Sequence, residues 1–333
     1  GDDLRFTGNF HMEDRRYMAN LEASYQPETD QFKALIRVPP VKFEPGAVQP
    51  LDLSPLYGAF FEDAEGSFEI NGEITADNGE VASDLTLFIF DLSGRNGDIR
   101  VDGLNGEITL SGLNPWTTLP QQTLTAEHLD VGLPLTDLSL TMALPGDDSL
   151  RIDFASAKLA GGRIVVDPSV LQLRPDGNAM MLNVRGVDIS ALLEDVDIPG
   201  LAVSGRLTGH IPVRMTNGEI VIENGRLDAD SAGTLRYVPT SGDVPLDLDD
   251  GNMELVLDAL ANFEFTELGI EVNRQAGGST ELGLHIAGAN PDLYDGYPIE
   301  FNVNLSGDLD KIVRESLAGW RIPEEIRKKL SGF

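Results

Sequence analysis

The sequence predicts a mainly β protein: a long antiparallel sheet with one apolar face and one polar face, together with a few short helices. Four segments share the pattern that predicts it, in which apolar and polar residues alternate with period two on both sides of a Gly-centred turn. The turns are of the Asn-Gly or Asp-Gly type, which favours tight hairpins. The four segments are residues 66–81, 97–113, 205–229 and 283–307.

The elements follow from this pattern in chain order. Residues 5–48 predict about three strands, and Leu85 to Phe90 is apolar on both faces, which predicts a central strand covered on both sides. A short helix between strands is expected at 189–196, because Asp188 is a favourable N-cap and Pro199 stops any continuation. No linker separates domains, so residues 1–333 are expected to form a single continuous region. Later strands are expected at 207–213, 219–223, 253–258, 263–273, 280–287 and 299–306, and a C-terminal helical cap at 309–330.

Charge and composition exclude several classes of partner. The formal net charge is −31, and nucleic acids and anionic lipid surfaces both require basic patches, so we expect no nucleic-acid partner. The absence of cysteine excludes disulfides and thiolate chemistry. The sequence contains no run of about 18 apolar residues, so it predicts no membrane-spanning helix. The first residues begin within a strand pattern, so we expect the chain to be part of a longer protein.

The sequence carries no recognisable catalytic signature. It lacks the nucleophile-elbow, phosphate-loop, zinc-protease and dinucleotide motifs, and its four histidines are far apart in sequence. We therefore expect no enzyme, no catalytic residue, no metal site and no cofactor. A polysaccharide-active enzyme would require a carboxylate cluster beside exposed aromatic residues on one face.

The apolar side of the alternating strands is the remaining candidate site. Alternation alone fits either a closed sandwich core or an open apolar groove, and it does not distinguish them. If the groove is open, the residues expected to line it are Phe68, Ile70, Ile108, Leu110, Leu207, Ile211, Val213, Leu282, Leu284, Ile286, Ile299, Phe301, Val303 and Leu305.

Two stretches resemble a known family. Residues 189–237 contain a short predicted helix followed by V-x-G-x-L-x-G-x-I-P-V, and residues 282–317 contain the more specific run G-x-NP-x-LYDGYPIEFN-x-NLSG. Both resemble the C-terminal part of the YdbH family, envelope proteins of Gram-negative bacteria that are similar to AsmA and TamB. Weaker similarity extends upstream to about Gly66.

This resemblance implies a non-enzymatic function. The fold that it implies is an elongated, curled antiparallel sheet of the β-taco type that forms an open apolar groove. Such a sheet would bridge the inner and outer membranes across the periplasm and carry phospholipid, with acyl chains in the groove and headgroups in water. The resemblance also implies an inner-membrane anchor in the full-length protein and a small outer-membrane lipoprotein as partner. The alternative is a structural or interaction module of the envelope with a closed β-sandwich core.

The last clear strand is the expected edge for that partner, which would add a strand by β-augmentation. Its residues are Ile299, Glu300, Phe301, Asn302, Val303, Asn304, Leu305 and Ser306.

Overall fold

The computed structural model describes residues 3–11, 17–53, 61–97, 99–172, 177–194, 200–216, 219–238, 253–276 and 280–305. Within these ranges the chain is mainly β, with 20 strands in one open antiparallel sheet and three short helices. The predicted fold class, a curled open sheet with few helices, is therefore confirmed. The chain divides into two compact units, which are described separately. Among the described residues, the first comprises residues up to 155 together with 168–178, and the second comprises 156–167 and 179–305.

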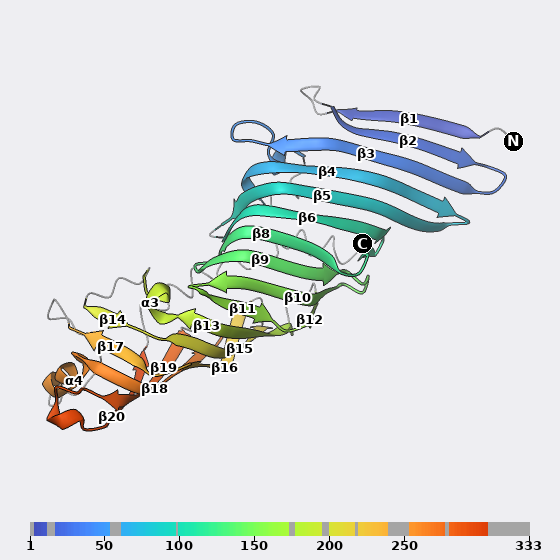
Figure 1. The fold of residues 1–333 in the computed structure, drawn as a ribbon. Coiled ribbons are helices and arrows are strands. Elements are labelled where there is room, and N and C mark those ends of the chain that lie inside the picture. The colour runs from blue at the N-terminus through green and yellow to red at the C-terminus, as the bar shows by residue number, and fades with distance from the viewer. Residues whose placement is uncertain are drawn as a thin grey trace. The chain divides into compact units, whose positions relative to one another are not determined.

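The first unit is an antiparallel meander in which each long strand pairs with the next (Figure 1). The strands from β3 to β6 are the long ribbons that curve together in the picture. The short β7 pairs with one end of β6, and β8 pairs with the rest of it. The strands are β1 (Leu4–His11), β2 (Tyr17–Gln26), β3 (Gln31–Phe43), β4 (Glu62–Asp77), β5 (Glu80–Asn96), β6 (Ile99–Leu113), β7 (Trp116–Thr118), β8 (Gln122–Asp130), β9 (Pro134–Ala143), β12 (Ser169–Gln172) and the first part of β10 (Ser149–Leu159).

Only some of the Asn-Gly pairs lie in turns. Asn78 and Gly79 have φ of 50° and 86° and connect β4 to β5 as a tight hairpin, as expected. Gly72, the glycine of another Asn-Gly pair, lies in the middle of β4. A Cβ at Gly72 would lie 1.9 Å from the carbonyl oxygen of Asp84, so glycine allows the two strands to approach there.

In the second unit, Gly209 lies within β15, inside the strand expected at 207–213, and a Cβ there would lie 1.9 Å from the carbonyl oxygen of Arg226. The register of β15 against β16 shifts between His210 and Val213, next to this glycine. Glycines within strands and nearby bulges bend a sheet, so these glycines favour curvature.

The second unit has the order β11–β13–β15–β16–β18–β19–β20, with β17 pairing both β14 and β18. The prediction of a strand at 253–258 is wrong, because this segment is a helix. Its strands are β11 (Gly162–Val166), β13 (Ala179–Asp188), β14 (Leu201–Val203), β15 (Arg206–Thr216), β16 (Glu219–Ala229), β17 (Gly233–Tyr237), β18 (Phe263–Arg274), β19 (Thr280–Ala289), β20 (Ile299–Leu305) and the end of β10.

The described part of the chain contains three short helices, α1 (Pro50–Leu53), α3 (Ile189–Leu192) and α4 (Met253–Leu260). It also contains a 3-10 turn, η1, at Tyr294–Gly296. Helix α3 begins where the sequence predicts it, and the Oδ1 atom of Asp188 accepts hydrogen bonds from the backbone N–H groups of Ser190 (2.9 Å) and Ala191 (3.3 Å). The helix ends at Leu192, with Leu193 as its C-cap, so the expected helix is too long at 193–194. Residues 195–196 and the expected helical cap at 309–330 lie outside the described residues.

Candidate functional site

In the first unit, cross-strand register gathers apolar side chains on one face. Ile70 of β4 pairs with Leu87 of β5, which pairs in turn with Ile108 of β6. Phe68 is two residues before Ile70, and Leu110 is two residues after Ile108, so both point to the same side. The four residues expected to line a groove in this unit therefore share one face.

This apolar face is incompletely covered. The side chains of Ile70, Leu87 and Ile108 are half-buried. On β1, at the edge of the meander, Leu4 is 48% exposed and Phe6 is 57% exposed. Because Phe6 pairs with Ala23 on the next strand, it belongs to a strip of apolar side chains that continues through β2 and β3 to β4. Within this strip Ala23 and Ala34 are buried, whereas Leu4, Phe6 and the half-buried side chains of β4 to β6 are in contact with solvent. Exposed apolar side chains gathered in this way are typical of a binding surface.

One end of the same face is closed by the segment around α1. Val48, which precedes α1, is buried in a cluster with Phe43 and Ile89, and Leu53 packs against it. The Gln49 side chain fixes this segment to β4: its amide donates to the carbonyl oxygen of Ala64 (3.0 Å) and accepts from the N–H of Ala64 (2.8 Å). The face is thus covered near α1 and half-open further along β4 and β5.

In the second unit, the register again pairs the residues expected to line a groove. Leu284 of β19 lies opposite Val303 of β20, and the neighbouring pairs on this face are Leu282 with Leu305, Ile286 with Phe301, and Gly288 with Ile299. Leu207, Ile211 and Val213 share the apolar side of β15.

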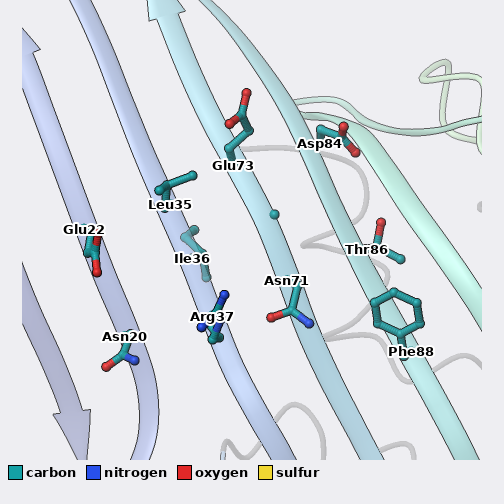
Figure 2. A pocket seen from close by; sticks show the side chains of 11 residues that line it. Asn20, Glu22, Leu35, Ile36, Arg37, Asn71, Glu73, Asp84, Thr86 and Phe88 are labelled. Atoms are coloured by element: carbon teal, nitrogen blue, oxygen red, sulfur yellow. The ribbon is translucent and has the colours of Figure 1, made fainter.

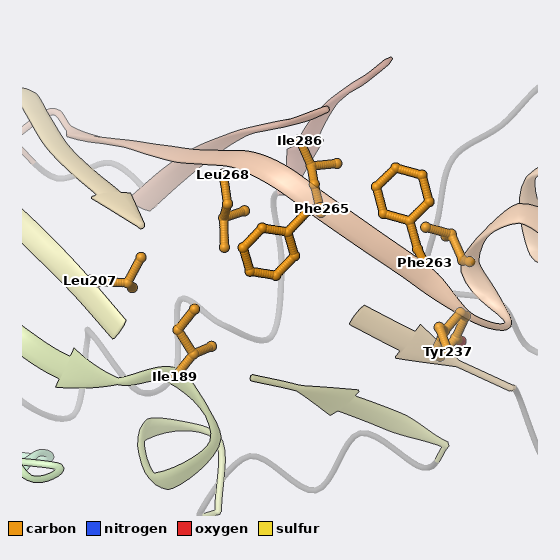
Figure 3. Packing of buried hydrophobic residues seen from close by; sticks show 8 residues of the cluster. Ile189, Leu207, Tyr237, Phe263, Phe265, Leu268 and Ile286 are labelled. Carbon is orange, nitrogen blue, oxygen red and sulfur yellow. The ribbon is translucent and has the colours of Figure 1, made fainter. Parts of the chain in front are cut away.

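Part of this second apolar face is a closed core (Figure 3). Leu207, Phe265 and Ile286 are each 1% exposed, and Ile189 of α3 and Leu260 of α4 belong to the same cluster. Leu207 and Ile286, although expected to line a groove, are therefore inaccessible here. Ile211, Val213, Leu282, Leu284, Ile299, Phe301 and Val303 remain half-buried.

Strand β20 lies at an edge of the second unit. Among the described residues it pairs with β19 and with no other strand. Its polar side chains Glu300, Asn302 and Asn304 are exposed, and His285 Nδ1 lies 3.0 Å from Asn302 Oδ1. Ser306, the last residue expected in this strand, lies outside the described residues. The backbone groups on the far side of β20 are in the position that a further strand would pair with.

The sequence was compared with known proteins. A family model described as intermembrane phospholipid transport protein YdbH matches residues 12–331. The chain belongs to the YdbH-like family. No curated protein and no solved structure matches this YdbH-like chain. The family description names a transport protein, in agreement with the expectation that this is not an enzyme.

The polar face of the YdbH-like sheet is an acidic, hydrated surface with local ion pairs. Arg226 and Asp228 of β16 form a pair with Nε and Oδ2 2.9 Å apart, and this hydrogen bond holds the pKa of Asp228 below its ordinary value. At α3, the hydrogen bond from the Ser190 hydroxyl, followed by that from the backbone of Ala191, lowers the pKa of Asp188. Over the described ranges, no group of three or more His, Asp or Glu side chains is arranged to hold a metal ion.

The polar face also has a feature that alternation did not predict. A hollow of about 470 Å³ crosses β2 to β5 on the side opposite Phe68 and Ile70 (Figure 2). The sequence offered one signal: Leu35, Phe88 and Phe90 interrupt the polar side of the alternating pattern. Phe90 is 46% exposed, so the expectation that Leu85 to Phe90 is covered on both sides is wrong at this position.

No helix in the part of the chain that the structure describes combines the length and the apolar character needed to cross a bilayer.

Proposed function

We propose that this chain carries phospholipid between the inner and outer membranes of the bacterial envelope, within the periplasm, with acyl chains along the apolar face and headgroups in water. The observation that carries the proposal is the apolar strip from β1 to β6, aligned in register across the strands and left half-open. The family description supports it independently.

The physical chemistry of acyl chains favours such a surface. Each methylene removed from water contributes about 0.8 kcal/mol, so full cover of a chain of about sixteen carbons contributes roughly 12 kcal/mol. A continuous apolar surface keeps the acyl chain out of water along its whole path, which lowers the free-energy barrier to movement of the lipid. This requires no catalytic residue and no cofactor. The acidic exterior, with a formal net charge of −31, disfavours self-association of a protein that exposes such a strip.

The two units contribute differently under this proposal. In the first unit, Ile70 and Ile108 are half-buried and belong to the continuous strip. In the second unit, the closed core around Leu207 and Ile286 leaves the outer positions, such as Val213 and Val303, as the accessible contacts. That residues 1–333 act as one continuous groove-forming region is part of the proposal.

The deciding experiment is native mass spectrometry of the purified chain, combined with lipid extraction. We expect bound phospholipid in the unmodified chain and at least about a tenfold reduction in the double variant Ile70→Asp, Ile108→Asp, because a carboxylate against an acyl chain costs more than about 1.4 kcal/mol. The matched control, Thr75→Asp with Thr125→Asp, adds the same charge on the opposite face and keeps the lipid. Circular dichroism confirms that both variants are folded.

The closed core around Leu207 favours the alternative function, a structural module of the envelope. That alternative predicts an unmodified chain without phospholipid. Equal lipid content in the two double variants would also contradict the groove assignment, since charge would then have the same effect on either face.

The proposal includes a small outer-membrane lipoprotein that adds a strand to β20. The chain has no cysteine, so single-cysteine variants such as Glu300→Cys, Asn302→Cys and Asn304→Cys give unique crosslinking positions on β20. Crosslinking in the native bacterium should join all three to one small lipoprotein, whereas Glu271→Cys, on the interior strand β18, should not react with it. Crosslinks to a second copy of this chain, or to no protein, would contradict this part of the proposal.

A further inference from the structure

The hollow on the polar face of the first unit is built from two rows of side chains. One row follows the register from Asn20 through Arg37 and Asn71 to Thr86. The other row is two residues away on each strand and runs through Glu22, Leu35, Glu73 and Asp84. Four strands about 4.8 Å apart give each row a length of roughly 14 Å.

Figure 2 shows the ring of Phe88 at one end of the hollow, beside Asn71 and Thr86. Phe88 stacks on Phe90, with ring centroids 6.4 Å apart and an interplanar angle of 9°. This pairing places an aromatic surface next to a set of planar polar groups. The polar, solvent-exposed face of a sheet does not need aromatic residues for its stability.

The wall of the hollow is rich in hydrogen-bond acceptors. Glu22, Glu73 and Asp84 supply three carboxylates, and Lys33 pairs with Glu73 from outside the hollow. The Asn71 amide donates to Glu69, and its Oδ1 atom is buried with no hydrogen-bond partner among the described residues. A buried acceptor without a donor costs about 1 to 3 kcal/mol, and a ligand that donates to it once the Asn71 side chain turns toward the hollow would recover that cost.

These features restrict the chemistry of a ligand. An anion such as a phosphate is repelled by the three carboxylates, and a phosphodiester has no proton to donate to Asn71. A simple cation would meet the guanidinium of Arg37 in the middle of the hollow. A neutral molecule with many hydroxyl groups fits best, because it donates to the acceptors, accepts from Arg37 and packs an apolar ring face on Phe88.

We propose that this hollow binds an oligosaccharide. The acyl chains of the proposed lipid cargo would lie on the other side, because Ile70 and Asn71 are consecutive in β4 and their side chains therefore point to opposite faces of the sheet. Binding here is independent of the proposed lipid transport. The function is recognition without bond cleavage, since the hollow supplies acceptors and an aromatic surface.

The test is ligand-observed saturation-transfer NMR with two neutral probes, chitotetraose and maltotetraose, at millimolar concentration. We expect a signal from at least one probe with the unmodified chain, and at least a tenfold loss of affinity in Asn71→Leu, which keeps the volume and removes the acceptor. Asn71→Leu removes a buried unpaired acceptor and also the hydrogen bond to Glu69, so circular dichroism first checks that the variant is folded. Phe88→Leu provides a second variant that tests the aromatic contact.

The matched control is Thr125→Val, on the same face but outside the hollow, with an expected change below twofold. Failure of both probes to bind the unmodified chain would overturn the proposal, as would equal binding by Asn71→Leu and the unmodified chain. Neither result bears on lipid content, which is measured separately with the Ile70 and Ile108 variants.

Discussion

The rings of Phe263 and Phe301 contact each other edge to face, with centroids 5.4 Å apart and planes at 61°. Phe263 begins β18 and Phe301 lies in β20, so the contact reaches past the intervening β19. Phe263 is completely buried, and Phe301 packs on the edge of the same cluster. The edge strand is thus held by an aromatic contact in addition to its hydrogen bonds with β19.

Truncation of Phe301 should loosen that edge. We expect Phe301→Ala to cost about 2 kcal/mol, less than the roughly 3 to 5 kcal/mol for a fully buried phenylalanine, because Phe301 is half-buried. Hydrogen–deuterium exchange should show faster exchange of β19 and β20 amides. Asn304→Ala, an exposed position on the same strand, is the control and should leave exchange unchanged.

Close approach of β4 and β5 should make Gly72 intolerant of any side chain. In Gly72→Ala the new Cβ would lie 1.9 Å from the carbonyl oxygen of Asp84, so the strands must separate, and we expect a loss of more than about 3 kcal/mol. Gly79→Ala is the matched comparison, because Gly79 also has positive φ but has no atom within 4 Å of the position that a methyl group would take. Its cost should be about 1 to 2 kcal/mol, from backbone strain alone. Thermal unfolding followed by circular dichroism compares the stabilities of the two variants. An equal loss of stability in both would show that the close approach of β4 and β5 has no energetic effect.

The attachment of α1 to β4 should depend on Gln49. Gln49→Leu removes both side-chain hydrogen bonds to the backbone of Ala64, leaving two backbone groups of a buried residue without these partners, and we expect a loss of about 2 kcal/mol. The amide of Ala64 should exchange faster with solvent. Gln26→Leu, at an exposed position, is the control. Unchanged exchange at Ala64 in Gln49→Leu would contradict this account.

The start of α3 should depend on pH through Asp188. Hydrogen bonds from Ser190 and Ala191 lower the pKa of this carboxyl group in the folded chain, so its stabilising effect is present above the unfolded pKa of about 3.8 and is lost as the pH falls through the lower folded value. NMR titration should give a pKa for Asp188 below 3.8, and the amides of Ser190 and Ala191 should lose protection at the same pH. Asp188→Asn, which keeps a cap without the titrating group, should lose this pH dependence. A titration midpoint at or above 3.8 would exclude the mechanism.

The alternating pattern predicted the strands and the shared faces because side-chain direction in a strand depends only on residue parity. The pairing of Ile286 with Phe301 and of Leu284 with Val303 follows from two alternating segments near each other in sequence. The spacing of Met253, Val256, Leu257 and Leu260 is helical, and this signal in the sequence would have identified α4, which we expected to be a strand.

Sequence alone could not predict which parts of a face are covered. Leu207 and Val213 both belong to the apolar side of β15, yet Leu207 is 1% exposed and Val213 is half-buried, because tertiary contacts with α3 and β18 reach only one end of the strand. The role of Gly72 was equally inaccessible, since an Asn-Gly pair is compatible with a hairpin turn and with a close approach between strands. The parity of a residue in a strand predicts the side of the sheet on which its side chain lies, but not which other residues pack against that side.

The register between β4 and β5 is uninterrupted from the pair Ser67–Phe90 to the pair Asp77–Glu80. Insertion of one residue near the middle of β4 would exchange the two sides of the sheet for the rest of that strand, placing Ile74 among the carboxylates and Glu73 among the apolar side chains. Insertion of two residues would restore the original sides. Insertions of an even number of residues within this strand should therefore be tolerated better than insertions of an odd number. An insertion in the hairpin at Asn78 and Gly79 does not change which side of the sheet the strand residues face, so this rule does not apply there.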